Sequence, residues 1–95
     1  MSWITSIVLV TAEPAHIDTL ARDLAQVDGV RETYLVAGGS PDIVAIIRTS
    51  THDEIADLVT GVINKLDGVT RTETKIAFRR YSKEEEGAAF EAFGD

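Results

Sequence analysis

A weak internal repeat constrains the fold of this chain more than any other feature of its sequence. The hexapeptide DGVRET at residues 28–33 returns as DGVTRT at residues 67–72, an offset of 39 residues. In each copy a segment with helical spacing of apolar residues precedes the Asp-Gly pair, and a segment rich in β-branched residues follows it. We therefore expect two strand–helix–strand halves in a chain of 95 residues, which is long enough for one domain.

The first half begins with a strand and continues with a one-sided helix. Residues 4–11 read ITSIVLVT, a nearly continuous apolar run that is typical of a central strand covered on both faces. Pro14 suits the first turn of the helix, where its missing N–H costs nothing. The helix is predicted to end at Asp28-Gly29. Its apolar face comprises Ile17, Leu20, Ala21, Leu24 and Val27.

A hairpin joins the two halves. Residues 30–37 and 43–47 are predicted strands, and Gly38-Gly39-Ser40-Pro41-Asp42 between them has the composition of a turn. Because the loop is short, the two strands are expected to pair in antiparallel orientation.

The second half repeats the pattern with clearer signals. Thr51 is a candidate N-cap with Glu54 three residues later, which is a capping box. Apolar residues recur at helical spacing over residues 55–66, so one continuous helix is expected there, ending at Asp67-Gly68. Residues 69–78 alternate, which predicts the last strand. Thr72 and Thr74 share one face of it.

The order β-α-β-β-α-β with right-handed crossovers indicates a ferredoxin-like α+β fold. It has a four-stranded antiparallel sheet with both helices on one face. The uncovered face would carry too many Val, Ile and Leu side chains for full solvation, so we expect a second copy to pair with it through the sheet as a two-fold dimeric α/β barrel. A face polar enough for a monomer is the alternative.

Residue types argue against catalysis, metals and cofactors. The chain has no cysteine, and His16 and His52 stand 36 residues apart without a third candidate ligand. Both histidines are predicted to be surface residues near helix starts. No segment resembles a nucleophile elbow, and the Gly-rich turn lacks the Lys-Ser/Thr of a phosphate loop. We expect a protein that is not an enzyme and binds neither metal nor cofactor.

Charge points away from nucleic acid. The net charge is −7, and residues 82–95 hold five carboxylates against one lysine, a net −4 that leaves −3 on the rest. Such a surface repels a phosphate backbone. With no signal peptide and no membrane span predicted, we expect a cytoplasmic protein with a domain at 1–81 and an acidic tail at 82–95. Phe90 and Phe93 could place a short docking helix in that tail, or the tail could simply be solvated.

The hairpin turn is the main candidate for binding. Gly38 and Gly39 allow close approach to backbone N–H groups, and Asp42 could hold an ammonium. These features suit a zwitterion such as an amino acid. Gly39, Ser40 and Asp42 are therefore candidate ligand-binding residues, with Thr72 and Thr74 adding hydroxyls. The plain alternative is an ordinary turn beside a threonine-rich strand.

Residues 36–78 resemble the C-terminal effector-binding (RAM) domain of the Lrp/AsnC family of leucine-responsive and asparagine regulators. The resemblance lies in the Gly-x-x-Asp turn, here Gly39-Ser40-Pro41-Asp42, and in Gly68-Val69 before the threonine-rich strand. It implies the fold above, dimerisation through the sheet, assembly of dimers as far as octamers, and an amino-acid pocket between dimers. Gly39 and Asp42 would contribute to that pocket, and Thr72 and Thr74 would reach it from another subunit.

Departures from the family pattern shape the functional hypothesis. The chain begins at the first strand, without a helix-turn-helix domain, so a stand-alone sensor that joins a DNA-binding relative is expected. Pro41 stands where the family often has an aromatic residue. The rival hypotheses are a chaperone-like module that binds peptides, an enzyme of the dimeric α/β-barrel type, and an assembly partner with a vestigial pocket. We expect Asp42→Ala to abolish amino-acid binding without disturbing the fold.

Overall fold

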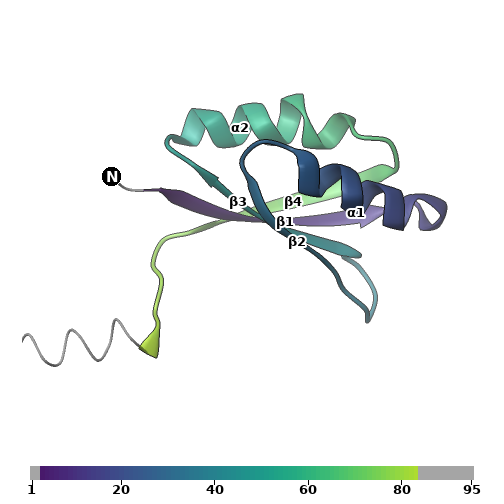
Figure 1. Ribbon diagram of the computed structural model, residues 1–95, viewed down its shortest axis with the longest axis horizontal. Coiled ribbons are helices and arrows are strands. Elements are labelled where there is room, and N and C mark those ends of the chain that lie inside the picture. Colours follow the sequence, from purple (N-terminus) through teal and green to yellow (C-terminus); the bar gives the residue numbers. More distant parts are fainter. Residues whose placement is uncertain (1–2, 84–95) are drawn as a thin grey trace, which may run out of the picture.

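The computed structural model describes residues 3–83 and follows the predicted order of elements (Figure 1). Two 3₁₀ turns, η1 and η2, accompany the helices. The elements are β1 (Ile4–Ala12), η1 (Pro14–His16), α1 (Ile17–Gln26), β2 (Val30–Leu35), β3 (Ile43–Thr49), α2 (His52–Gly61), η2 (Ile63–Lys65) and β4 (Val69–Ala77). The predicted acidic tail lies outside the described residues except for Ser82 and Lys83, so its boundary and the helix with Phe90 and Phe93 stay predictions.

The strands form one antiparallel sheet in the order β2-β3-β1-β4, and both helices lie on the same side of it (Figure 1). β1 is central, with Val8 opposite Ala45 of β3 and Thr74 of β4. This is the ferredoxin-like α+β arrangement that the repeat predicts. Within the described residues, none of the helices has the length and apolar character needed to span a membrane.

The core lies between the sheet and the helices. Alternate residues of β1 and β3 face the helices and are buried, as expected for strands with one covered face. Each fully buried Val, Leu or Ile side chain contributes about 1.5–3 kcal/mol relative to exposure. The fully buried apolar side chains are Val8, Val10, Leu20, Leu24, Ile43, Ala45, Ile47 and Ile63.

The second helix is shorter than predicted. A continuous helix over residues 55–66 is wrong, because α2 ends at Gly61 and Val62 adopts φ −123° and ψ −62°. Gly61 is a poor helix former and two β-branched residues follow it, so the helical backbone gains little there. The tighter 3₁₀ turn that follows buries Ile63 completely. Tertiary burial thus overrides the local periodicity at this end.

The capping box of α2 is present with one altered partner. The Thr51 hydroxyl accepts the Glu54 N–H at 3.1 Å, as predicted. The Glu54 carboxylate reaches back to the N–H of Ser50 at 2.8 Å and not to that of Thr51. Two N–H groups at the start of the helix are satisfied in this way.

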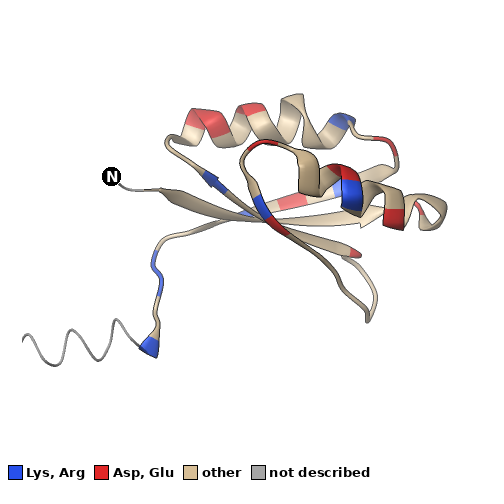
Figure 2. Cartoon of the chain, viewed as in Figure 1, with Lys and Arg blue, Asp and Glu red and all other residues tan. Residues whose placement is uncertain are grey.

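The face of the sheet away from the helices is apolar along its middle. Ile7 and Leu9 of β1 and Val44 and Ile46 of β3 are only half-buried. Arg71, Glu73 and Lys75 of β4 pair with residues of β1 that share this face, so charged positions flank the stripe. Figure 2 shows charged residues along β4 and at one end of β3, where Arg48 lies. The single chain therefore leaves an apolar sheet surface uncovered.

Candidate functional site

The turn between β2 and β3 requires glycine at two positions. Gly38 has φ +115° and Gly39 has φ +103°, a region that residues with a Cβ rarely adopt. The chain returns through Ser40 and a cis peptide bond to Pro41. The Val36 N–H donates to the Asp42 carbonyl at 2.9 Å and closes the turn. Both positions of the turn therefore favour glycine for their backbone conformation alone.

Asp42 attaches this turn to the central strand. Its backbone N–H donates to the Val10 carbonyl at 2.9 Å, and its Oδ2 accepts the Ala12 N–H at 2.9 Å. The residue is half-buried. The carboxylate therefore has a structural role that the sequence did not suggest, and its Oδ2 already has a donor.

Thr72 and Thr74 lie on the face of the sheet that the helices cover. They pair with Val10 and Val8, whose side chains are buried beneath the helices. The Thr72 hydroxyl donates to the Asn64 side-chain oxygen at 2.7 Å, and Thr74 is exposed. A hollow beside Ser40 is lined by neither Thr72 nor Thr74. That Thr72 and Thr74 contribute to a pocket from another subunit stays a prediction.

A small hollow of about 140 Å³ opens beside the turn on the uncovered face of the sheet. Arg71 and Glu73 place opposite charges on its wall. Register explains this: Thr11 lies opposite Arg71 and Leu9 opposite Glu73, so all four residues share one face. The hollow is lined by Leu9, Thr11, Ser40, Pro41, Arg71 and Glu73.

Sequence reasoning missed Arg71 and Glu73 as site residues. The alternation of residues 69–78 placed both on one face of the last strand, but nothing local showed that this face meets the turn. Glu73 also forms an exposed ion pair with Lys75 at 3.3 Å, an interaction of small energy in water. Its carboxylate remains accessible to a ligand at the hollow.

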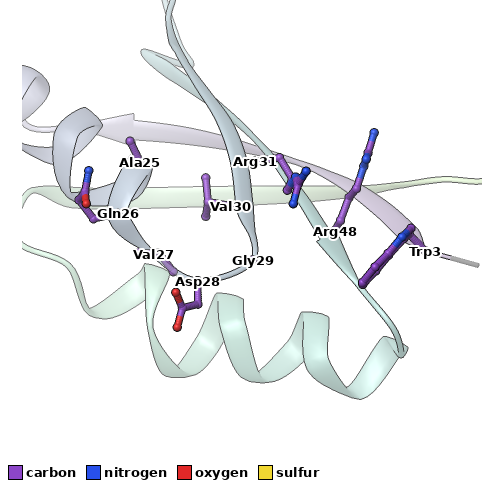
Figure 3. Close-up of a pocket in the computed structure, with 9 residues that line it drawn as sticks. All are labelled: Trp3, Ala25, Gln26, Val27, Asp28, Gly29, Val30, Arg31 and Arg48. Carbon is purple, nitrogen blue, oxygen red and sulfur yellow. The ribbon is translucent and has the colours of Figure 1, made fainter.

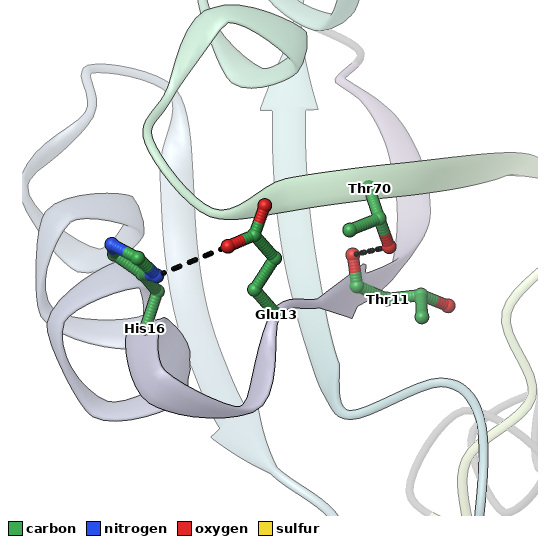
Figure 4. Close-up of polar contacts among 4 residues, drawn as sticks. All are labelled: Thr11, Glu13, His16 and Thr70. Atoms are coloured by element: carbon green, nitrogen blue, oxygen red, sulfur yellow. Dashed lines mark hydrogen bonds and ion pairs between the residues drawn. The ribbon is translucent and has the colours of Figure 1, made fainter.

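The junction between β1 and the first helix supports the same end of the sheet. The Thr70 hydroxyl donates to the Thr11 carbonyl at 3.0 Å, next to a register shift between β1 and β4 (Figure 4). His16 Nδ1 lies 3.5 Å from a carboxylate oxygen of Glu13, and the Glu13 N–H donates to the Gly68 carbonyl at 2.8 Å. These contacts hold the start of β4 against β1. Among residues 3–83, no three His, Asp or Glu side chains converge on a metal position.

Comparison with known proteins identifies one family. A family model described as the Lrp/AsnC ligand binding domain matches residues 5–86. The transcriptional regulator LrpA of Pyrococcus abyssi is 32% identical over 71 residues, which cover 75% of this chain and 50% of LrpA. This chain thus spans about half the length of that curated relative.

Two solved structures show the same fold at different lengths. TTHA0845 from Thermus thermophilus superimposes with a TM-score of 0.78 at 39% identity, covering 84% of this chain and 99% of that one. A feast or famine regulatory protein of M. tuberculosis, complexed with L-methionine, superimposes with a TM-score of 0.69 at 26% identity. The match covers 84% of this chain and 54% of the regulatory protein's chain. The family is one of regulator ligand-binding domains and not of enzymes.

Proposed function

The chain belongs to the family of Lrp/AsnC ligand-binding domains, and we propose on this premise that it binds a small amino-acid effector and couples binding to its own assembly. The proposed readout is regulatory, through a changed oligomer or through association with a DNA-binding relative. The family match, the L-methionine in a solved relative and the hollow beside the β2–β3 turn support this proposal.

The observation that carries the proposal is the pair of opposite charges on the wall of that hollow. The guanidinium of Arg71 can pair with a carboxylate, and the carboxylate of Glu73 can accept an ammonium. An amino acid carries both groups on one carbon. Ser40 adds a hydroxyl from the turn, and Gly39 keeps the turn in the conformation that places it there. Asp42 acts in this scheme by anchoring the turn to β1.

Assembly would complete the site. The hollow opens on the uncovered sheet face, whose half-buried apolar stripe is suited to a second copy. A copy lying on this face in a two-fold dimer would remove the hollow from bulk water and strengthen its charge–charge interactions. Higher assemblies could bring in Thr72 and Thr74 of another subunit. A ligand bound between copies stabilises the assembly that contains its pocket.

The test is thermal melting against the common amino acids, with oligomer size measured in parallel at fixed protein concentration. A true effector at 100 times its dissociation constant stabilises the protein by about 2.7 kcal/mol per site. In so small a domain each kcal/mol of stabilisation raises the melting temperature by roughly 4–8 °C, so the effector should give a clear shift. The variants Arg71→Ala and Glu73→Gln should lose the shift.

Arg22→Ala is the matched control, because Arg22 is exposed on α1 and outside the hollow. It should keep the shift. If no amino acid raises the melting temperature, or if Arg71→Ala behaves like Arg22→Ala, the amino-acid proposal is wrong. A monomer without any amino-acid response would favour a module that binds peptides.

A further inference from the structure

A larger hollow, of about 480 Å³, opens at the other end of the sheet (Figure 3). It lies where β2 begins and β3 ends, since Val30 pairs with Ile47 and Ile4 of β1 pairs with Thr49. The hairpin turn and its small hollow are at the opposite end of these strands. The volume falls within the range of small-molecule sites. It is lined by Trp3, Ala25, Gln26, Val27, Asp28, Gly29, Val30, Arg31 and Arg48.

The backbone that forms one side of this hollow is held in place by hydrogen bonds. The Arg48 N–H donates to the Gly29 carbonyl at 2.9 Å, and the Val30 N–H donates to the Val27 carbonyl at 3.1 Å. Gly29 adopts φ +96°, and an added Cβ would lie 3.3 Å from Leu58 of α2. The wall is therefore formed before any ligand arrives, which lowers the ordering cost of binding.

Two guanidinium groups reach this hollow from adjacent strands. The pairing of β2 with β3 shifts between Val30 and Glu32, so Arg31 is the extra residue of a β-bulge. Bulges re-aim side chains, and this one brings Arg31 to the same hollow as Arg48. Within residues 3–83, neither guanidinium forms an ion pair or a side-chain hydrogen bond. Two cationic side chains that line one hollow without an ion pair favour an anion there.

An aromatic side chain completes the wall. Trp3 is the only tryptophan of the sequence and is 57% exposed, and Figure 3 shows it beside Arg48. An exposed indole offers a large flat apolar surface on which another ring can stack. Asp28, elsewhere on the wall, can accept hydrogen bonds from donors on a ligand.

From this combination we infer that the hollow binds a small anion that carries a planar ring. The anionic group would pair with the guanidinium groups of Arg31 and Arg48, whose forked donors match carboxylate and phosphate oxygens. The ring would stack on Trp3. Aromatic carboxylates and nucleoside monophosphates share this chemistry. The site is separate from the proposed amino-acid site, and its test does not depend on that proposal.

Trp3 provides the readout, because selective excitation of the indole reports on this one residue. The full chain is titrated with adenosine monophosphate and, separately, with para-hydroxybenzoate. A saturable change in the indole emission with either ligand supports the site, and the ligand that gives it distinguishes a phosphate source from a carboxylate source. Inorganic phosphate and adenosine, which each carry half of the ligand, should bind at least about tenfold more weakly.

The variants assign the binding to named groups. Arg48→Ala should weaken binding by about tenfold or more, since it removes a charge-assisted hydrogen bond. Arg48→Lys keeps the charge without the fork and should lie in between. Arg22→Ala removes an arginine elsewhere and should bind like the unaltered chain. Trp3→Ala should weaken binding by about tenfold. Calorimetry measures the affinity of this variant, because it lacks the indole.

Three results would overturn the inference. One is the absence of a saturable change with both ligands in the folded protein. Another is an affinity of Arg48→Ala equal to that of Arg22→Ala. The last is a chain ending at Lys83 whose ligand-free indole emission differs from that of the full chain, because the acidic tail and not a small anion would then occupy the hollow.

Discussion

Replacing Asp42 by alanine should destabilise the protein even when no ligand is present. The Asp42 carboxylate accepts the N–H of Ala12, a residue that is only 6% exposed. In the alanine variant that N–H loses its acceptor in a site that water reaches poorly. An unsatisfied buried donor costs about 1–3 kcal/mol. The structure thus revises the expectation from sequence that Asp42→Ala leaves the fold undisturbed.

The assay is thermal and urea unfolding of Asp42→Ala at fixed protein concentration, because assembly makes the melting temperature depend on concentration. For a domain of this size each kcal/mol corresponds to roughly 4–8 °C, so a fall of at least about 4 °C is expected. Asp42→Asn is the matched variant, since its amide oxygen can still accept the Ala12 N–H without the charge. The asparagine variant should melt near the unaltered protein.

This pair of variants also separates the two roles assigned to Asp42. If the asparagine variant is stable but loses the amino-acid response, the charge contributes to effector binding as well as to the turn. If both variants unfold like the unaltered protein, within about 0.5 kcal/mol, the hydrogen bond from Ala12 to Asp42 does not stabilise the fold.

Two further predictions concern the backbone and a titrating group. Gly68→Ala should destabilise the protein more than Gly38→Ala in urea unfolding. Both glycines have positive φ, but a Cβ added at Gly68 would lie 2.5 Å from His16, whereas one added at Gly38 would have nothing within 4 Å. Equal losses of stability would mean that the contact with His16 relaxes freely. The pKa of Tyr34 is raised because its hydroxyl donates to the Glu32 carboxylate, whose negative charge also opposes the phenolate. The stability that the protonated Tyr34 hydroxyl contributes is therefore present below the unfolded pKa of about 10 and is lost as pH rises through the folded pKa. Glu32→Gln should lower that pKa in a phenolate absorbance titration, and an unchanged titration would refute the cause.

Local pattern was sufficient for most of the fold. The β-branched run of residues 4–11, the helical spacing before each Asp-Gly pair and the hairpin turn predicted every strand and both helices, and the repeat predicted their order. The wrong prediction at the end of α2 shows where local pattern fails. The chain after Gly61 forms a 3₁₀ turn that buries Ile63 completely, and the spacing of apolar residues does not distinguish this turn from a continued helix. The family was also readable from the turn at Gly39 and the pair at Gly68.

The candidate sites depended on contacts between residues far apart in the chain. Thr11 and Arg71 are 60 residues apart and become neighbours only through the register of β1 with β4, which sets the wall of the small hollow. In the same way, a bulge in β2 places Arg31 with Arg48 and Trp3. A single-residue shift of register would turn these side chains to the other face of the sheet. The sequence by itself determined the elements and their order, because backbone preference and side-chain period act over a few residues. Tertiary structure decided which charged side chains meet, because strand register is set by packing across the whole core.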